Sequence, residues 1–137
     1  DEYLLEDLIT ANEILDKNRS IDYLIGNRIS SGTKFIYKKN LYGVIALTKL
    51  TNFLYNLNLT DIACATKIFR RSIYNKFTYK NNHFDYEFEV MCKFAKIKSK
   101  FQEYTVEYNP RSFDDGKKLR AFKDGPMILA TIILNYF

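Results

Sequence analysis

Three cationic side chains flank one short segment near the C-terminus of the chain. Arg111 follows Pro110, and Lys117 and Lys118 follow the Asp115-Gly116 pair. Glycine adopts positive φ without a steric clash, so Asp115-Gly116 predicts a turn that brings the two ends of the segment together. Cationic side chains held so near to one another repel each other unless an anion neutralises their charge. The segment is therefore either a phosphate-binding loop or an ordinary solvated turn, and the spacing alone does not separate the two.

The segment 26–32 has a composition that is typical of phosphate-binding turns. It combines two glycines with Arg28, Ser30 and Ser31, and it directly follows the apolar run 21–26. Such a run predicts a buried strand, and loops at the ends of central strands often bind phosphate through hydroxyl and guanidinium groups. A plain Ser/Gly linker explains the composition equally well.

Asp61 is one of only two acidic residues between positions 17 and 80. A carboxylate in such basic surroundings is either the anchor of an ion pair or a functional group whose charged form is held by its neighbours. The sequence leaves both alternatives open.

The net charge of +5 conceals an asymmetry along the chain. Residues 1–16 carry six acidic side chains and no basic one, whereas residues 17–80 carry twelve basic side chains and two acidic ones. This central excess of positive charge favours an anionic partner, such as a phosphate group, a nucleic acid or an anionic membrane surface.

Cysteine usage and hydropathy indicate the compartment. Cys64 and Cys92 lack metal-ligand spacing and predict a reducing environment without a disulfide. No signal peptide is apparent, and the longest apolar run, 126–134, is far shorter than the roughly 20 residues that a membrane-spanning helix needs. We expect a cytoplasmic chain that does not cross a membrane by itself.

Hydrophobic periodicity predicts one α/β domain over residues 1–137. The expected elements are helices over 2–17, 41–57, 85–98 and 121–136, strands over 21–26 and 101–108, a short strand or turn over 67–71 and a short helix over 72–77. No strand precedes the first helix, so we expect the chain to begin partway through a fold. A sheet without its upstream strands leaves an open edge, which predicts self-association into a homo-oligomer.

Four stretches, taken in order, carry a family resemblance. They are Ile25-Gly26-Asn27-Arg28, Thr60-Asp61 with Lys67-Ile68-Phe69-Arg70, Phe84-Asp85-Tyr86-Glu87-Phe88-Glu89, and 111–119. Their order and spacing resemble the second half of the family 2 glycosyltransferases of GT-A fold, of the dolichol-phosphate mannose synthase type. The resemblance extends from residue 1 nearly to residue 137 and implies the acceptor-side half of a mixed sheet flanked by helices.

The resemblance implies an inverting transfer of a sugar from a nucleotide donor to a polyprenyl phosphate at a membrane surface, as in the synthesis of cell-envelope glycans. Mg²⁺ or Mn²⁺ is implied for the full enzyme, held by an Asp-x-Asp motif in a nucleotide-binding half upstream of residue 1. The present chain offers no recognisable metal ligands and is expected to be inactive alone.

Residue roles follow from the same resemblance. Arg28, Ser30 and Ser31 would contact the acceptor phosphate. Asp61 would face the reaction centre, where it either orients the sugar or pairs with a basic residue. Three further cations would close over the donor diphosphate or the acceptor. They are Arg111, Lys117 and Lys118.

The chain departs from the family pattern at three places. It has Asn27 where the family has Ser, Ala65-Thr66 where an aromatic residue precedes the lysine, and Phe88 in place of Pro between two glutamates. The competing interpretation is a nucleic-acid-binding module, because basic and aromatic residues alternate over 37–39 and 74–79. No RNP, KH or helix-turn-helix pattern accompanies them, so we expect no nucleic-acid partner.

Overall fold

The computed structural model describes residues 3–32, 34–35, 37–111, 114 and 121–137. Over these residues the chain forms five helices and three strands, and the predicted α/β class is confirmed. In chain order the elements are α1 (Leu5–Lys17), β1 (Tyr23–Asn27), α2 (Lys38–Tyr55), β2 (Lys67–Phe69), α3 (Arg71–Tyr74), α4 (Tyr86–Lys96), β3 (Phe101–Thr105) and α5 (Ala121–Tyr136).

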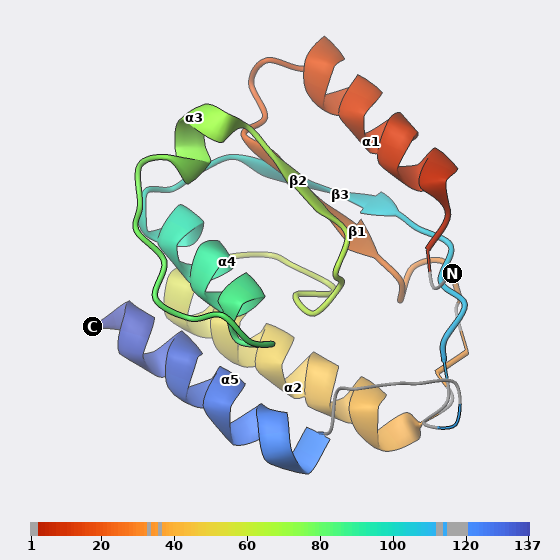
Figure 1. Cartoon of the computed structure of the whole chain (residues 1–137), viewed down its shortest axis with the longest axis vertical. Coiled ribbons are helices and arrows are strands. Elements are labelled where there is room, and N and C mark those ends of the chain that lie inside the picture. The colour runs from red at the N-terminus through yellow and green to blue at the C-terminus, as the bar shows by residue number, and fades with distance from the viewer. Residues whose placement is uncertain (1–2, 33, 36, 112–113, 115–120) are drawn as a thin grey trace.

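The three strands lie between α1 and α4 (Figure 1) and form a mixed sheet in the order β2-β1-β3. The central strand, β1, pairs antiparallel with β2 and parallel with β3. All five residues of β1 are buried. The middle position explains this burial, because helices cover both faces of the strand and a neighbouring strand covers each edge.

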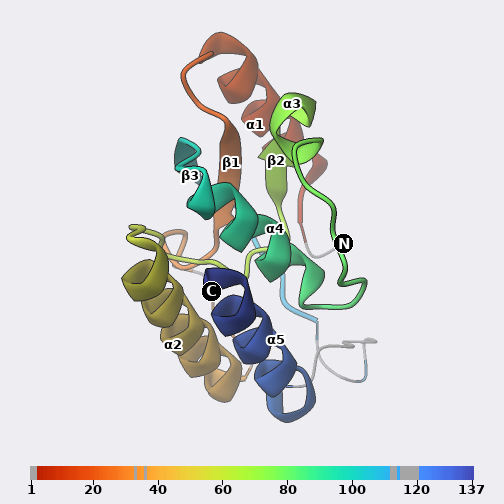
Figure 2. The same ribbon diagram turned by 90° about the vertical axis from the view of Figure 1, so that its left-hand side faces the viewer.

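Helices lie on both faces of the sheet (Figure 2). One face carries α1, whose Ala11 and Leu15 pack with Leu24 of β1. The opposite face carries α4, with α2 and α5 beyond it, and this larger core includes Tyr23 and Ile25. Successive residues of a strand point to opposite faces, so β1 supplies both cores.

The strand that begins at Phe101 is shorter than the period-two pattern predicts. Its ladder with β1 ends at Thr105, where β1 itself ends at Asn27. Tyr108 then pairs with Tyr3 in an isolated antiparallel bridge. The end of the neighbouring strand, rather than the missing N–H of Pro110, therefore terminates this ladder.

Candidate functional site

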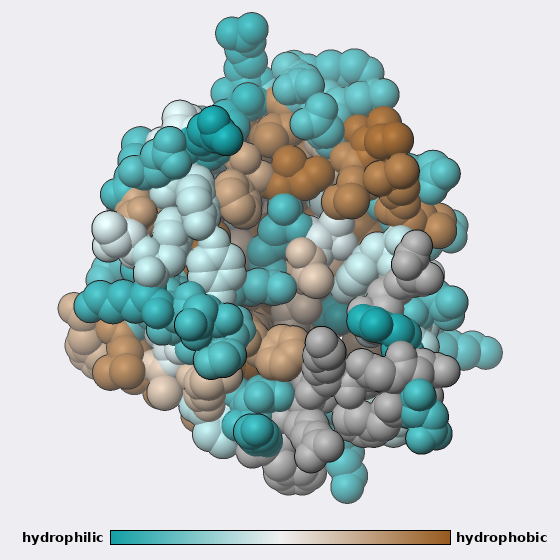
Figure 3. All heavy atoms as spheres, in the orientation of Figure 1, coloured by the Kyte–Doolittle hydropathy of each residue, from teal (hydrophilic) through white to brown (hydrophobic). Residues whose placement is uncertain are grey.

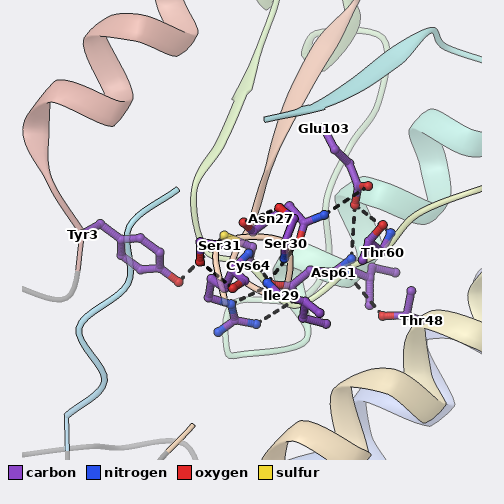
Figure 4. Close-up of polar contacts among 12 residues, drawn as sticks. Tyr3, Asn27, Ile29, Ser30, Ser31, Thr48, Thr60, Asp61, Cys64 and Glu103 are labelled. Atoms are coloured by element: carbon purple, nitrogen blue, oxygen red, sulfur yellow. Dashed lines mark hydrogen bonds and ion pairs between the residues drawn. The ribbon is translucent and has the colours of Figure 1, made fainter. Parts of the chain in front are cut away.

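The carboxyl end of β1 holds a buried ion pair between Arg28 and Asp61, the second of which is labelled in Figure 4. The guanidinium donates from Nε to Oδ2 at 2.7 Å and from Nη2 to Oδ1 at 2.8 Å, and the Arg28 backbone N–H also donates to Oδ2 at 3.2 Å. Asp61 is 0% exposed and Arg28 is 7% exposed. Two of the predicted site residues thus meet, and Asp61 pairs with a basic residue, the second of its two expected arrangements.

The pair keeps Arg28 charged in a buried position. Burial by itself disfavours the cation, but the hydrogen bonds and charge of Asp61 outweigh burial and raise the pKa of Arg28 above its ordinary value. A bidentate contact also fixes the plane of the guanidinium. The pair has no net charge, so any further anion here needs other cations to balance it.

Three aromatic rings surround this ion pair. The Cζ atom of Arg28 lies 5.4 Å from the ring centroid of Phe35 and 5.1 Å from that of Tyr108. The Tyr3 ring lies 5.2 Å from the Tyr108 ring, and burial raises the pKa of Tyr3 above its usual value. The rings come from three separate segments, before α1, after β1 and after β3, so no local pattern in the sequence marks them as one group.

Glu103 of β3 holds the two loops that carry the ion pair (Figure 4). Its Oε1 accepts the backbone N–H groups of Thr60 at 2.7 Å and Asp61 at 3.1 Å, and its Oε2 accepts Nδ2 of Asn27 at 3.4 Å. No motif in the sequence marks Glu103 as a site residue. Its only signal was a place on the polar side of an alternating strand.

Asn27 organises the turn that follows β1. Its Oδ1 accepts the backbone N–H groups of Ile29 and Ser30, both at 3.0 Å. The N–H of Gly32 bonds instead to the carbonyl of Ile29 at 3.2 Å. The backbone N–H groups of Ile29, Ser30 and Gly32 are therefore engaged within the turn itself.

The two predicted serines lie beside Arg28. Ser30 Oγ is 3.2 Å from Thr105 Oγ1, which joins the turn to the end of β3. Ser31 Oγ donates to the carbonyl of Arg28 at 2.7 Å. Both hydroxyl groups belong to the same cluster as the ion pair.

Only part of the predicted cationic loop is described. Arg111 is exposed and follows Tyr108, whose ring covers Arg28. Lys117, Lys118 and the turn over 115–116 lie outside the described residues, so the predicted arrangement of these cations stays a prediction.

A second ion pair joins β2 to α4. Lys67 Nζ lies 2.9 Å from Glu87 Oε2, and it also donates to the carbonyl of Cys64. Glu89, two residues further along α4, points elsewhere, because its carboxylate accepts the backbone N–H groups of Lys80 and Asn81. Only one of the two glutamates thus reaches the strand end, because residues two apart on a helix do not share a face.

The two cysteines are free and buried. Burial raises the pKa of Cys64 above its usual value and that of Cys92 to about 11. Both thiols therefore stay protonated at neutral pH, and neither is a ready nucleophile.

The described residues do not supply a metal site. Over these parts of the chain no three acidic, His or Cys side chains cluster closely enough to hold an ion such as Mg²⁺ or Mn²⁺. The same residues include no helix that is both long and apolar enough to cross a membrane.

Comparisons of the chain with protein-family models, with curated proteins and with solved structures returned no match.

Proposed function

We propose that the chain is the acceptor-side half of a GT-A glycosyltransferase that transfers a sugar to a polyprenyl phosphate. The observation that carries the proposal is the convergence of the first three of the four stretches that define the resemblance. Arg28 joins the first to the second through Asp61, and Lys67 joins the second to the third through Glu87. Tyr108, just before the fourth stretch, stacks on Arg28. Ligands of α/β proteins commonly bind at such carboxyl ends of parallel strands.

The proposed reaction needs arginine and lysine side chains to bind phosphate but needs no histidine as a general base. A phosphate monoester has its second pKa near about 6, so the acceptor is largely a dianion at neutral pH. One phosphate oxygen attacks the anomeric carbon, and the bond from that carbon to the donor diphosphate breaks. The diphosphate leaves with the bonding electron pair, and no proton is transferred. The protein's task is to orient and neutralise phosphate charge.

In this proposal Asp61 positions Arg28, and Arg28 contacts the acceptor phosphate. The hydrogen bonds to Asp61 occupy Nε and Nη2 of the guanidinium. The N–H groups of Nη1 then provide the contact to phosphate, with the Ser30 and Ser31 hydroxyls nearby. Because the ion pair is neutral overall, the charge of the anion is balanced by Arg111, Lys117 and Lys118. The chain works at the membrane surface, where its lipid acceptor resides.

The direct test is to measure, by NMR and titration calorimetry, whether the chain binds farnesyl phosphate, a short and soluble polyprenyl phosphate. We expect saturable shifts of the amide signals of residues 27–31, and no such shifts with farnesol, which lacks the phosphate. Arg111→Ala should weaken binding by about tenfold or more, since a charge-assisted contact contributes roughly 1.5–3 kcal/mol and 1.4 kcal/mol is tenfold.

Lys17→Ala is the matched control. Lys17 is also a cation, but its side chain is 79% exposed and pairs with Glu13 in the same helix. Equal binding of farnesol and farnesyl phosphate, or equal effects of the two substitutions, would reject the proposed site. Saturable binding of short RNA or DNA without binding of farnesyl phosphate would favour the nucleic-acid-binding alternative.

A further inference from the structure

Among the described residues, the strand β2 has a neighbouring strand on only one of its two edges. Hydrogen bonds from Gly26 N–H to the Thr66 carbonyl and from Arg70 N–H to the Asp22 carbonyl fix the register with β1. In an antiparallel ladder the backbone groups of successive residues point alternately toward and away from the partner. Those of Lys67 and Phe69 therefore point outward, and among the described residues no backbone group pairs with them.

Apolar side chains of α1 lie beside this edge. Leu5, Leu8 and Ile9 are 66%, 39% and 53% exposed. The opposite flank of the helix faces the segment that follows β3, because Asp7 accepts the N–H of Glu107 at 3.0 Å. Figure 3 looks toward the edge of β2, and hydrophobic atoms gather there over α1. The exposed apolar flank of α1 therefore lies next to β2, the edge strand of the sheet.

A cavity flanks the same strand edge near α3. It has a volume of about 460 Å³ and is lined by Phe69, Arg71, Tyr74 and Asn75. The rings of Phe69 and Tyr74 stack at 5.2 Å and form one wall. An unpaired edge between an apolar helix flank and an aromatic cavity has the features of a surface that receives another strand.

We infer that the occupant of this edge is β2 of a second copy of the chain. A two-fold axis through Ile68 places Lys67 of each copy opposite Phe69 of the other. The outward backbone groups of both residues then form four hydrogen bonds, so the edge is complementary to itself. The product is a continuous six-stranded sheet in which the two α1 flanks meet on one face.

The charges of the two copies are complementary in this arrangement. The α1 helix runs alongside β2 in the same direction, because Tyr3 Oη lies 3.9 Å from Cys64 Sγ while Arg70 Nη2 donates to the Leu15 carbonyl at 2.6 Å. Antiparallel pairing therefore brings the residues after β2 of one copy to the start of α1 of the other.

The residues after β2 are basic and the start of α1 is acidic. Arg71 and Lys76 are exposed beyond the end of β2, and Glu6 is exposed in the first turn of α1. Opposite charges therefore meet at both ends of the interface. A stable dimer buries roughly 1,200–2,000 Å² in total, so the helix flanks must contribute in addition to the three-residue strand.

Sedimentation velocity over a range of protein concentrations tests the pairing. We expect the unaltered chain to be dimeric, and Leu5→Glu with Ile9→Glu to raise the dimer dissociation constant at least a hundredfold. Leu134→Glu on α5 is the matched control, because Leu134 is 74% exposed and lies away from β2. A chain that stays monomeric at high concentration, or a dimer broken only by Leu134→Glu, would overturn the inference.

Amide hydrogen exchange identifies the edge itself. The N–H groups of Lys67 and Phe69 should exchange slowly in the dimer and at least tenfold faster after dilution to the monomer. The N–H of Ile68 points toward β1 and should be protected in both states. A dimer in which Lys67 and Phe69 exchange as fast as in the monomer uses another surface and contradicts the inference. Neither measurement depends on transferase activity.

Discussion

At the scale of single residues, Arg28 and Asp61 depend on each other. Each is buried, and each satisfies the charge of the other through two side-chain hydrogen bonds. Removing one partner of a buried pair leaves an uncompensated charge, which costs more than the pair itself contributes. Substitution of one partner alone should therefore have a large effect on the stability of the chain.

Asp61→Asn should destabilise the chain strongly, since it keeps the shape of the side chain but removes the charge that Arg28 requires. We expect a loss of about 3–5 kcal/mol in the free energy of unfolding, measured by urea denaturation. The double variant Asp61→Asn with Arg28→Met should lose less than the sum of the two single changes. Additive losses would show that the two side chains are not coupled.

Glu89 makes stability depend on pH. Although burial by itself raises the pKa of this carboxyl, hydrogen bonds from Lys93, Asn81 and Lys80 outweigh burial and lower the pKa below its ordinary value. Because the pKa of Glu89 is lower in the folded state, the stabilisation that its charge provides is fully present above the unfolded pKa of about 4.3. It is lost as the pH falls through the folded value.

Glu89→Gln should therefore lower the free energy of unfolding at pH 7 by about 1–3 kcal/mol and flatten its decline in acid. Glu13→Gln serves as the control, because the Glu13 side chain is 61% exposed in a surface pair. Urea denaturation at several pH values between about 3 and 7 measures both. The same acid dependence in Glu89→Gln and in the unaltered chain would exclude this role.

At the scale of elements, periodicity predicts most of the secondary structure and little of the site. The helix 121–136 occurs with the predicted bounds, and the apolar run at 21–26 forms the buried strand β1. Helical and strand periods are local, so a sequence displays them directly. The pairing of Asp61 with Arg28, 33 residues apart, depends on tertiary packing.

Glu103 is even harder to predict from the sequence than the Arg28–Asp61 pair. Its hydrogen bonds reach back 43 residues to Thr60 and 76 residues to Asn27. A polar residue on the outer side of a strand usually faces solvent, so the alternating pattern favours the wrong environment for this carboxylate. Only the parallel pairing of β3 with β1 brings the three segments together.

Gly26→Ala should disturb the end of β1. A Cβ atom there would lie 2.8 Å from Cys64 Sγ and 2.9 Å from Val106 Cγ1, both in buried residues. Overpacking of this kind costs about 1–3 kcal/mol, which thermal denaturation would detect. Gly43→Ala in α2 is the control, since nothing lies within 4 Å of its added Cβ, and it should stabilise by about 0.5–1 kcal/mol. Equal melting temperatures for the two variants would contradict the close packing at Gly26.

At the scale of the whole molecule, charge is separated along the chain. The acidic side chains of residues 1–16 belong mostly to α1, on one face of the sheet, whereas the basic block begins at Lys17, the last residue of that helix. The turn after β1 and the segment after β3 lie together at one end of the sheet, with Arg28 and Arg111 among their residues. This arrangement favours an anion at that end and a second copy at the β2 edge, which are separate surfaces.

If the proposed function is right, this chain should bind the lipid acceptor without catalysing sugar transfer. By the proposed resemblance, the four stretches belong to the acceptor side, and the nucleotide donor would bind to the other half of the enzyme. We therefore expect the purified 137-residue chain to bind farnesyl phosphate and yet to transfer no sugar from UDP- or GDP-sugars, with either Mg²⁺ or Mn²⁺ present. Binding of the acceptor provides the control for a folded site, and radiolabelled sugar in the lipid extract measures the transfer. Turnover by this chain alone would show that donor binding resides within these residues and that the proposed division into halves is wrong.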